Sequence, residues 1–411
     1  MLITLLFSSI FMVLLFNTVS IERKNGVLLA LLIYCVVSLF DFGWLSCMLH
    51  VPFHYTDPTD YYSNTVGVSF RDLFHMEGTT TNLFYVIINW LYNHFYDNPY
   101  LISFFIKINN ILVILVSYLY LTCNIKTFTK NDLIILLNPY LLETIIRNVR
   151  DSYIILFVAL VLGGLNILKD VKKDHLLLLL GIFLLAITRA ILLLPVILVI
   201  LIRIIKKNAR YIYIIIPVVL FVLFYFRDMI ISKIVVQTIS AMEFVNEDAS
   251  EFAELLDQQY SLSTLILLLK RFGIGLVALL FTPHPINYFQ EWIMGHGALG
   301  DFGIYTGFDN FLIVIGAIYC YVFLIPRLFW YVYNHGRISN ELFCFILSFV
   351  LIYVVAYLGV TDIRNRHLFF FYMMIDIIYK ESERSDAIKI DGKFYLLSLC
   401  VFVGLFMISA V

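Results

Sequence analysis

The stretch YLISFFIKINNILVILVSYLYLT, residues 100–122, decides the fold class, because Lys107 is its only charged residue. A helix that crosses the hydrocarbon core of a bilayer needs about 20 consecutive, mainly apolar residues, and this stretch is long enough. Similar runs recur along the chain, and we expect about twelve membrane-spanning helices. The expected spans are residues 2–18, 27–48, 100–122, 132–146, 152–168, 175–188, 190–205, 211–226, 309–330, 341–360, 367–380 and 393–410.

The overall composition agrees with a membrane protein. The chain has 411 residues, of which 62% are hydrophobic and 14% charged, and its mean hydropathy is +0.92. Soluble domains carry about 25% charged residues, so these values exclude a soluble enzyme, a secreted disulfide scaffold and a disordered chain. A net charge of -1 excludes a general nucleic-acid-binding surface. We therefore predict an all-α, polytopic integral membrane protein in which residues 1–411 form a single domain.

The distribution of basic residues predicts the orientation, because short cytoplasmic loops are enriched in Lys and Arg. The basic turns all fall on the cytoplasmic face if both termini are extracytoplasmic. Two large extracytoplasmic loops result, at residues 49–99 and 227–308. The spans at 132–146 and 175–188 are short for a full crossing, so we expect them to be kinked, tilted or partly buried in protein.

Both large loops contain segments that are typical of helices lying in the membrane interface. Residues 83–96 (LFYVIINWLYNHFY) are aromatic and amphipathic. Residues 264–281 carry Lys270 and Arg271 in the middle of an apolar run, and their sequence also permits a membrane span. A span there would reverse the side of every later loop.

Arginine departs from the orientation rule that lysine obeys. The predicted cytoplasmic face holds eleven of fourteen lysines, whereas the outer face holds eight of fourteen arginines. Arginine binds phosphate and carboxylate groups through two parallel hydrogen bonds, which lysine cannot do. The excess of outer arginines therefore indicates an anion-binding role at that face.

The outer arginines gather at the ends of expected spans. Arg147, Arg150 and Asp151 are spaced to share one face of a helix, and Arg189 lies between two apolar runs. An arginine at membrane depth is costly unless it is paired or faces a polar cavity. A further group, Arg364, Arg366 and His367, occurs in VTDIRNRHLF.

We expect these cations to bind the phosphate or pyrophosphate of a lipid carrier. The alternative is that they pair with carboxylates and lock helices together, for instance Arg150 with Glu143 or Asp151.

The first large loop supplies acidic residues near the same membrane level. In VPFHYTDPTDYYSN, Asp57 and Asp60 follow the second span and are surrounded by His54 and three tyrosines. Either aspartate could act as a general base that deprotonates an acceptor hydroxyl, while the tyrosines stack on sugars. The alternative is an Asp-Pro turn beside an interfacial aromatic belt. A divalent metal could assist, but no metal-ligand motif specifies one.

The order of these features resembles a bacterial polyprenol-dependent glycosyltransferase of the GT-C type, and also the polysaccharide polymerases of the Wzy or EpsG type. The resemblance rests on DPTDYY, NPYLLETIIRNVRDSYIILF and TDIRNRHLFFF. One span more than is usual for the GT-C type precedes the acidic residue, and an Arg-x10-Gly repeat is absent.

The resemblance implies a glycosyltransferase of cell-surface polysaccharide assembly in the bacterial inner membrane, with its active site facing the exterior. Its donor would be a sugar or repeat unit on undecaprenyl phosphate or pyrophosphate, and its acceptor a glycan. Asp60 or Asp57 would be catalytic, and the arginines would bind the lipid phosphate. We favour a repeat-unit polymerase slightly over a transferase of single sugars. A chain-length regulator or a flippase could act with it.

A transporter of lipid-linked oligosaccharide is the main alternative from another class, and a noncatalytic scaffold is a third. A transporter predicts cations along a route through the whole membrane and an internal repeat. Neither feature is apparent in the sequence.

Overall fold

The computed structural model describes residues 21–54, 57–75, 83–95, 98–147, 150–168, 175–189, 192–208, 307–335, 339–357 and 366–382, with parts of 392–401 and a few single residues elsewhere. These residues form helices and connecting turns, and none of them lies in a β-strand, so the all-α prediction is confirmed. The expected span at 211–226 and the loop at 227–308 lie almost wholly outside the described residues, as does the span at 2–18.

The chain divides into two compact units. Unit 1 consists of Met1–Leu193, Pro285–Leu342 and His367–Val411, and unit 2 consists of Leu194–His284 and Phe343–Arg366. Most of the described part of unit 2 is in helices α10 (Leu193–Lys207) and α19 (Asn340–Tyr357). The described helices of unit 1 are α2 (Ile21–Gly43), α3 (Asp57–Ser63), α4 (Leu83–Phe95), α5 (Pro99–Leu121), α6 (Lys130–Leu136), α7 (Pro139–Ile146), α8 (Asp151–Gly164), α9 (His175–Arg189), α17 (Gly307–Tyr319), α18 (Ile325–His335) and α20 (Arg366–Ser382).

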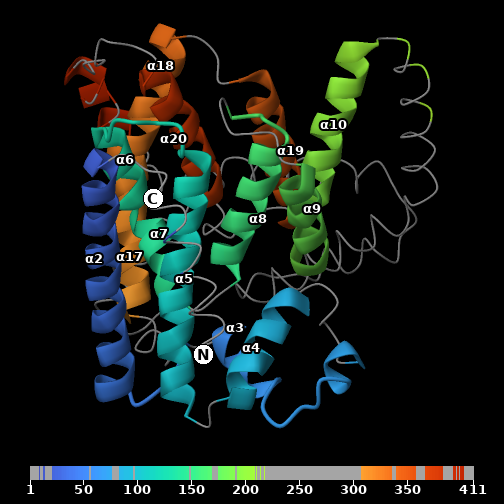
Figure 1. Cartoon of the computed structure of the whole chain (residues 1–411). Coiled ribbons are helices and arrows are strands. Elements are labelled where there is room, and N and C mark those ends of the chain that lie inside the picture. Colours follow the sequence, from blue (N-terminus) through green and yellow to red (C-terminus); the bar gives the residue numbers. More distant parts are fainter. Residues whose placement is uncertain are drawn as a thin grey trace, which may run out of the picture. The chain divides into compact units, whose positions relative to one another are not determined.

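Helix α7 lies at the centre of unit 1, where it contacts α2, α5, α8 and α17 (Figure 1). All eight of its residues are buried. Helix α5 is also largely buried and packs against both α2 and α8. Among the described residues, two helical segments, Arg23–Met48 and Pro99–Leu121, are long and apolar enough to cross a membrane. The total of about twelve spans stays a prediction.

Helix α2 buries several polar side chains and exposes a row of apolar side chains on the opposite face. Arg23, Tyr34 and Asp41 are fully buried. The opposite face carries aliphatic and aromatic side chains that are between 48% and 61% exposed: Leu28, Leu32, Val36 and Phe40. A continuous apolar stripe of this kind is unfavourable in water and favourable against lipid tails. This distribution supports membrane contact by α2.

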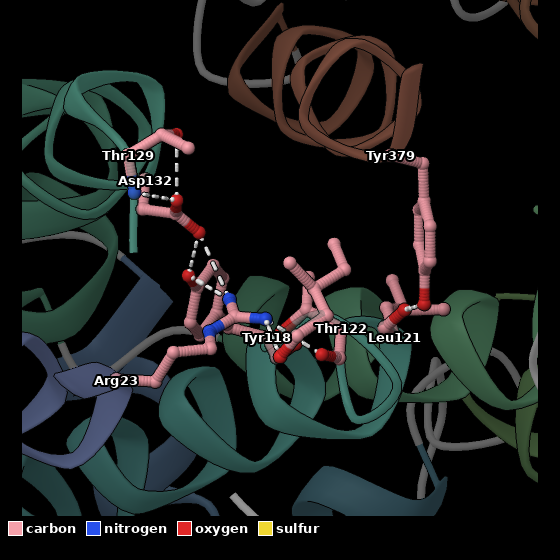
Figure 2. Close-up of polar contacts among 8 residues, drawn as sticks. Arg23, Tyr118, Leu121, Thr122, Thr129, Asp132 and Tyr379 are labelled. Carbon is pink, nitrogen blue, oxygen red and sulfur yellow. Dashed lines mark hydrogen bonds and ion pairs between the residues drawn. The ribbon is translucent and has the colours of Figure 1, made fainter. Parts of the chain in front are cut away.

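Arg23 joins the beginning of α2 to the end of α5 (Figure 2). Its guanidinium donates to the carbonyls of Thr122 at 2.7 Å and Ile125 at 3.1 Å. It also donates to the Tyr118 hydroxyl and forms an ion pair of 2.9 Å with Asp132 at the start of α6. Each of these partners compensates part of the cost of burying the cation.

Helix α20 contacts the same end of α5. The Tyr379 hydroxyl donates to the carbonyl of Leu121, as Figure 2 shows. The adjacent Lys380 lies over the ring of Tyr331 in α18, 5.2 Å from the ring centroid. Residues that the sequence places on the cytoplasmic face therefore meet at one end of unit 1.

Glycines allow α8 and α9 to pack closely. A Cβ atom on Gly164 would lie 2.6 Å from the Cβ of Leu178, and one on Gly181 would lie 3.0 Å from the Cβ of Leu160. Small residues of this kind let two helices approach at the level of their backbones. The packing sets the end of α9 beside the beginning of α8.

The expected span at 132–146 is divided into α6 and α7, which confirms that it is kinked and buried. Pro139 has no N–H, and the N–H of Tyr140 donates to the side chain of Asn138 at 3.0 Å. The N–H of Asn138 donates to Ile135 rather than to the carbonyl four residues before it. The carbonyls of Ile134 and Leu136 therefore lose their usual helical partners.

Two tyrosines from neighbouring helices compensate for this loss. The Tyr34 hydroxyl of α2 donates to the carbonyl of Leu136, and the Tyr319 hydroxyl of α17 donates to the carbonyl of Ile134. Packing of α2 and α17 therefore stabilises the break between α6 and α7, and the break fixes where α7 begins.

We predict that Tyr34→Phe destabilises the protein by about 1–3 kcal/mol, because the carbonyl of Leu136 would be buried without a donor. Thermal unfolding of the purified chain in detergent measures the effect. Tyr333→Phe is the matched control, since Tyr333 is 78% exposed, and it should change stability by less than about 0.5 kcal/mol. Equal stability of Tyr34→Phe and wild type would contradict this account of the break.

Candidate functional site

The turn between α7 and α8 is held in place by polar side chains of α5. The last carbonyls of a helix have no partner within it and carry partial negative charge. At the end of α7, the carbonyl of Ile145 accepts from Asn110 at 3.2 Å, and that of Ile146 accepts from the ammonium of Lys107. Asn110 also accepts from the hydroxyl of Ser152 at 2.7 Å, in the first turn of α8.

A buried aspartate joins this turn to the end of α2. Asp41 accepts from Lys107 Nζ at 2.7 Å, and its two carboxylate oxygens lie 3.0 and 3.2 Å from Nε2 of His54. Asp41 and Lys107 are fully buried, and His54 is 1% exposed. Because Arg23 contacts the end of α5 and Asp41 contacts its beginning, α2 and α5 are antiparallel. The two ionic clusters therefore lie at opposite ends of these helices.

The predicted site residues around this turn form ion pairs. Within α7, Arg147 pairs with Glu143 at 3.3 Å, and both are buried. Between α9 and α8, Arg189 pairs with Asp151 at 3.5 Å. Arginines of this group therefore pair with carboxylates, as the alternative interpretation expected. The pairs involve Arg147 and Arg189, whereas the expected examples involved Arg150.

Arg150 occupies the N-cap position of α8, and its carbonyl accepts from the N–H groups of Tyr153 and Ile154. Its side chain is partly exposed and makes no ion pair with another described residue. The pairs Lys107–Asp41, Arg147–Glu143 and Arg189–Asp151 each cancel in formal charge. Arg150 therefore carries the uncompensated positive charge among these four cations.

We call this group the corner site. It comprises Asp41, His54, Lys107, Asn110, Glu143, Arg147, Arg150, Asp151, Ser152 and Arg189, all of them in unit 1. The sequence-based site included four of these, Arg147, Arg150, Asp151 and Arg189, and the structure brings those four together.

The acidic segment of the first loop is connected to the corner site through His54. The Thr59 hydroxyl in α3 donates to the carbonyl of His54 at 3.0 Å. The next residue, Asp60, is exposed. Asp57 begins α3, but its side chain lies outside the described residues. The loop and the turn at 147–151 thus belong to one hydrogen-bonded network, with Asp60 at its exposed edge.

The late basic cluster is not tested by the structure. Arg366 begins α20 and His367 follows it, but the side chains of both lie outside the described residues. Arg364 lies outside them entirely. Their convergence with the corner site stays a prediction.

An aromatic helix packs beside the corner site. The predicted interfacial segment 83–96 forms α4, and the ring of Phe84 packs against Tyr153 and Phe157 of α8 at centroid distances of 5.3 and 5.0 Å. The Tyr153 hydroxyl in turn accepts from the buried Asn109 of α5. Aromatic side chains therefore adjoin the beginning of α8, where Arg150 lies.

Sequence reasoning missed Asp41 and Lys107, although a signal was present. Each is a lone charge in an apolar run, and each lies about 10–12 Å along its helix from the outer end of that run. Opposite charges at equal depth in neighbouring spans are expected to pair, because an unpaired charge is costly in lipid.

Comparisons with protein-family models, curated proteins and solved structures found no match. Within the described ranges, no three His, Cys, Asp or Glu side chains are grouped so that they could hold a metal ion.

We predict that Lys107→Met destabilises the protein by about 3–5 kcal/mol, because it leaves Asp41 buried without its cation. Adding Asp41→Asn should recover part of this loss, since both buried charges are then removed. The difference between the double variant and the sum of the singles measures the coupling. Thermal unfolding in detergent provides all the values.

Lys206→Met, at an exposed lysine of α10, is the matched control and should change stability by less than about 0.5 kcal/mol. Additive effects of Asp41→Asn and Lys107→Met would contradict the buried pair.

Proposed function

We propose that the protein is a glycosyltransferase of bacterial cell-surface polysaccharide assembly that works in the inner membrane. Its donor would be a sugar or repeat unit on undecaprenyl phosphate or pyrophosphate, and its acceptor a glycan. Within this class we favour a repeat-unit polymerase over a transferase of single sugars. Chemistry would take place at the outer leaflet.

The observation that carries the proposal is the corner site, a group of buried charged residues within a largely apolar helical unit. Ionisable groups at membrane depth are costly and are typically retained for function. If the charges served only to hold helices together, balanced ion pairs would be enough. This site has three such pairs and, in addition, the partly exposed Arg150.

In this proposal Arg150 binds the lipid phosphate. Its position at the N-terminus of α8 adds backbone N–H groups and the positive end of the helix dipole, both of which favour anions. Arg147 and Arg189 hold the turn and α9 in position through their carboxylate partners. Arg364, Arg366 and His367 remain further candidates for binding the lipid phosphate. Stabilising the leaving phosphate lowers the barrier to transfer.

The acceptor would bind at the exposed edge formed by α3. Asp60, with Asp57 as the alternative, would hydrogen-bond the attacking hydroxyl and is a candidate to take its proton. The half-buried rings of Tyr61 and Tyr62 lie in the same helix and could stack on sugar faces.

We predict that Asp60→Asn and Arg150→Lys each reduce glycan transfer by about 100-fold or more, through loss of the carboxylate and of the bidentate phosphate contact. The gene would be deleted in its host, and surface polysaccharide would be separated on a gel after complementation with each variant. A polymerase predicts that the wild-type ladder collapses to a single repeat unit in the deletion strain and with both variants.

Asp72→Asn and Arg71→Lys are the matched controls, because both residues are exposed in the same loop outside the corner site, and both should restore the ladder. A full-length ladder with altered mobility in the deletion strain would indicate a transferase of single sugars instead. Wild-type ladders with Asp57→Asn, Asp60→Asn and Arg150→Lys would contradict the proposed site and favour a transporter of lipid-linked oligosaccharide.

A further inference from the structure

The side chain of His54 is oriented by Asp41, and its backbone is fixed by Thr59. Nε2 lies within hydrogen-bonding distance of both carboxylate oxygens of Asp41, and the backbone carbonyl accepts from Thr59. Asp41 also accepts from Lys107, which has no acceptor atom to offer. An ionised carboxylate only accepts hydrogen bonds, so Nε2 of His54 must carry a proton and donate it.

The other ring nitrogen of His54 then carries a lone pair. Nδ1 is buried and has no hydrogen-bond partner among the described residues. If Nδ1 were protonated, its N–H would be buried without an acceptor, so the neutral ring protonated at Nε2 fits the surroundings. A ligand hydroxyl that reached Nδ1 would supply the donor that this buried lone pair lacks.

We propose that His54, held by Asp41, is the catalytic base that takes the proton of the acceptor hydroxyl. This inference rests on the proposed glycosyl transfer. The hydroxyl oxygen forms a bond to the anomeric carbon of the donor while its proton passes to Nδ1. The bond between that carbon and the phosphate oxygen breaks, and the phosphate leaves with the electron pair. Asp60 then orients the acceptor and does not take the proton.

The charges of the cluster suit this step. Before transfer, Asp41 and Lys107 cancel and His54 is neutral. After transfer, His54 is an imidazolium beside the Asp41 carboxylate, and the cluster has gained one positive charge as the phosphate departs with its negative charge. Opposite charges therefore develop together, and the arrangement of a carboxylate that orients and stabilises an imidazolium serves general base catalysis elsewhere.

The test uses the purified full-length chain in lipid nanodiscs. The probe is the polyprenol-linked glycan extracted from the deletion strain, and polymer or product formation is followed from about pH 5 to pH 8, a range that spans the ordinary histidine pKa of about 6.5. The rate for wild type should rise with pH, because a general base acts only in its unprotonated form. Among the described residues, Asp41 and Lys107 are the charged groups of this cluster.

His54→Gln is the decisive variant, because the glutamine amide can still donate to Asp41 but is not basic. We expect an unchanged melting temperature, a rate lowered by about 100-fold or more, and loss of the rise with pH. Asp60→Asn should keep that rise whatever its rate. His175→Gln is the matched control, since His175 is exposed at the opposite end of α9, and it should match wild type.

A folded His54→Gln chain with a rate within about threefold of wild type and the same pH profile would overturn the inference and leave the proposed function intact. An inactive wild-type chain would overturn both. If His54→Gln fails to fold, the dependence of the Asp60→Asn rate on pH decides. If the rate of this variant no longer rises with pH, the proton passes to Asp60 and the inference is overturned. If the rate still rises with pH, the result supports His54.

Discussion

The ammonium group of Lys107 is the contact on which the architecture of the corner site depends. It joins three helices, because it donates to Asp41 of α2 and to the last carbonyl of α7 from its own position in α5. Burying an ammonium group costs several kcal/mol, and only a carboxylate together with a carbonyl of the right orientation offsets that cost. The requirement fixes the depth of α2 against α5 and the point at which α7 must end. The turn that carries Arg147 and Arg150 is thereby placed.

The same logic recurs at the opposite end of these helices and at the centre of unit 1. Arg23 joins α2, α5 and α6 through a carboxylate and backbone carbonyls, and the hydroxyls of Tyr34 and Tyr319 satisfy the carbonyls that are freed between α6 and α7. In each case a polar side chain in an apolar helix compensates a backbone group that has lost its partner. An interior that is polar at selected points and an exterior lined by leucine is the arrangement that lipid favours.

The ion pairs change how the arginine cluster is understood. The sequence presents Arg147, Arg150 and Arg189 as equivalent phosphate ligands. In the structure two of them have carboxylate partners: the Arg147–Glu143 pair lies at the end of α7, and the Arg189–Asp151 pair joins α9 to α8. Arg150 is the one of the three without a carboxylate partner among the described residues, and in the proposed mechanism the proton passes to His54 beside Asp41. Function in this proposal therefore depends on one arginine and one histidine supported by balanced pairs.

The sequence by itself determined the all-α class, the polar turn at 147–151, the aromatic helix at 83–96 and the interruption of the span at 132–146. These follow from local chemistry: apolar length, helical spacing of charges, and the missing N–H of Pro139. The pairing of Asp41 with Lys107, of Arg189 with Asp151 and of Tyr34 with Leu136 was decided by the tertiary structure alone. Each joins helices that are remote in sequence, and the partner of a buried polar group depends on which helices pack together and at what depth.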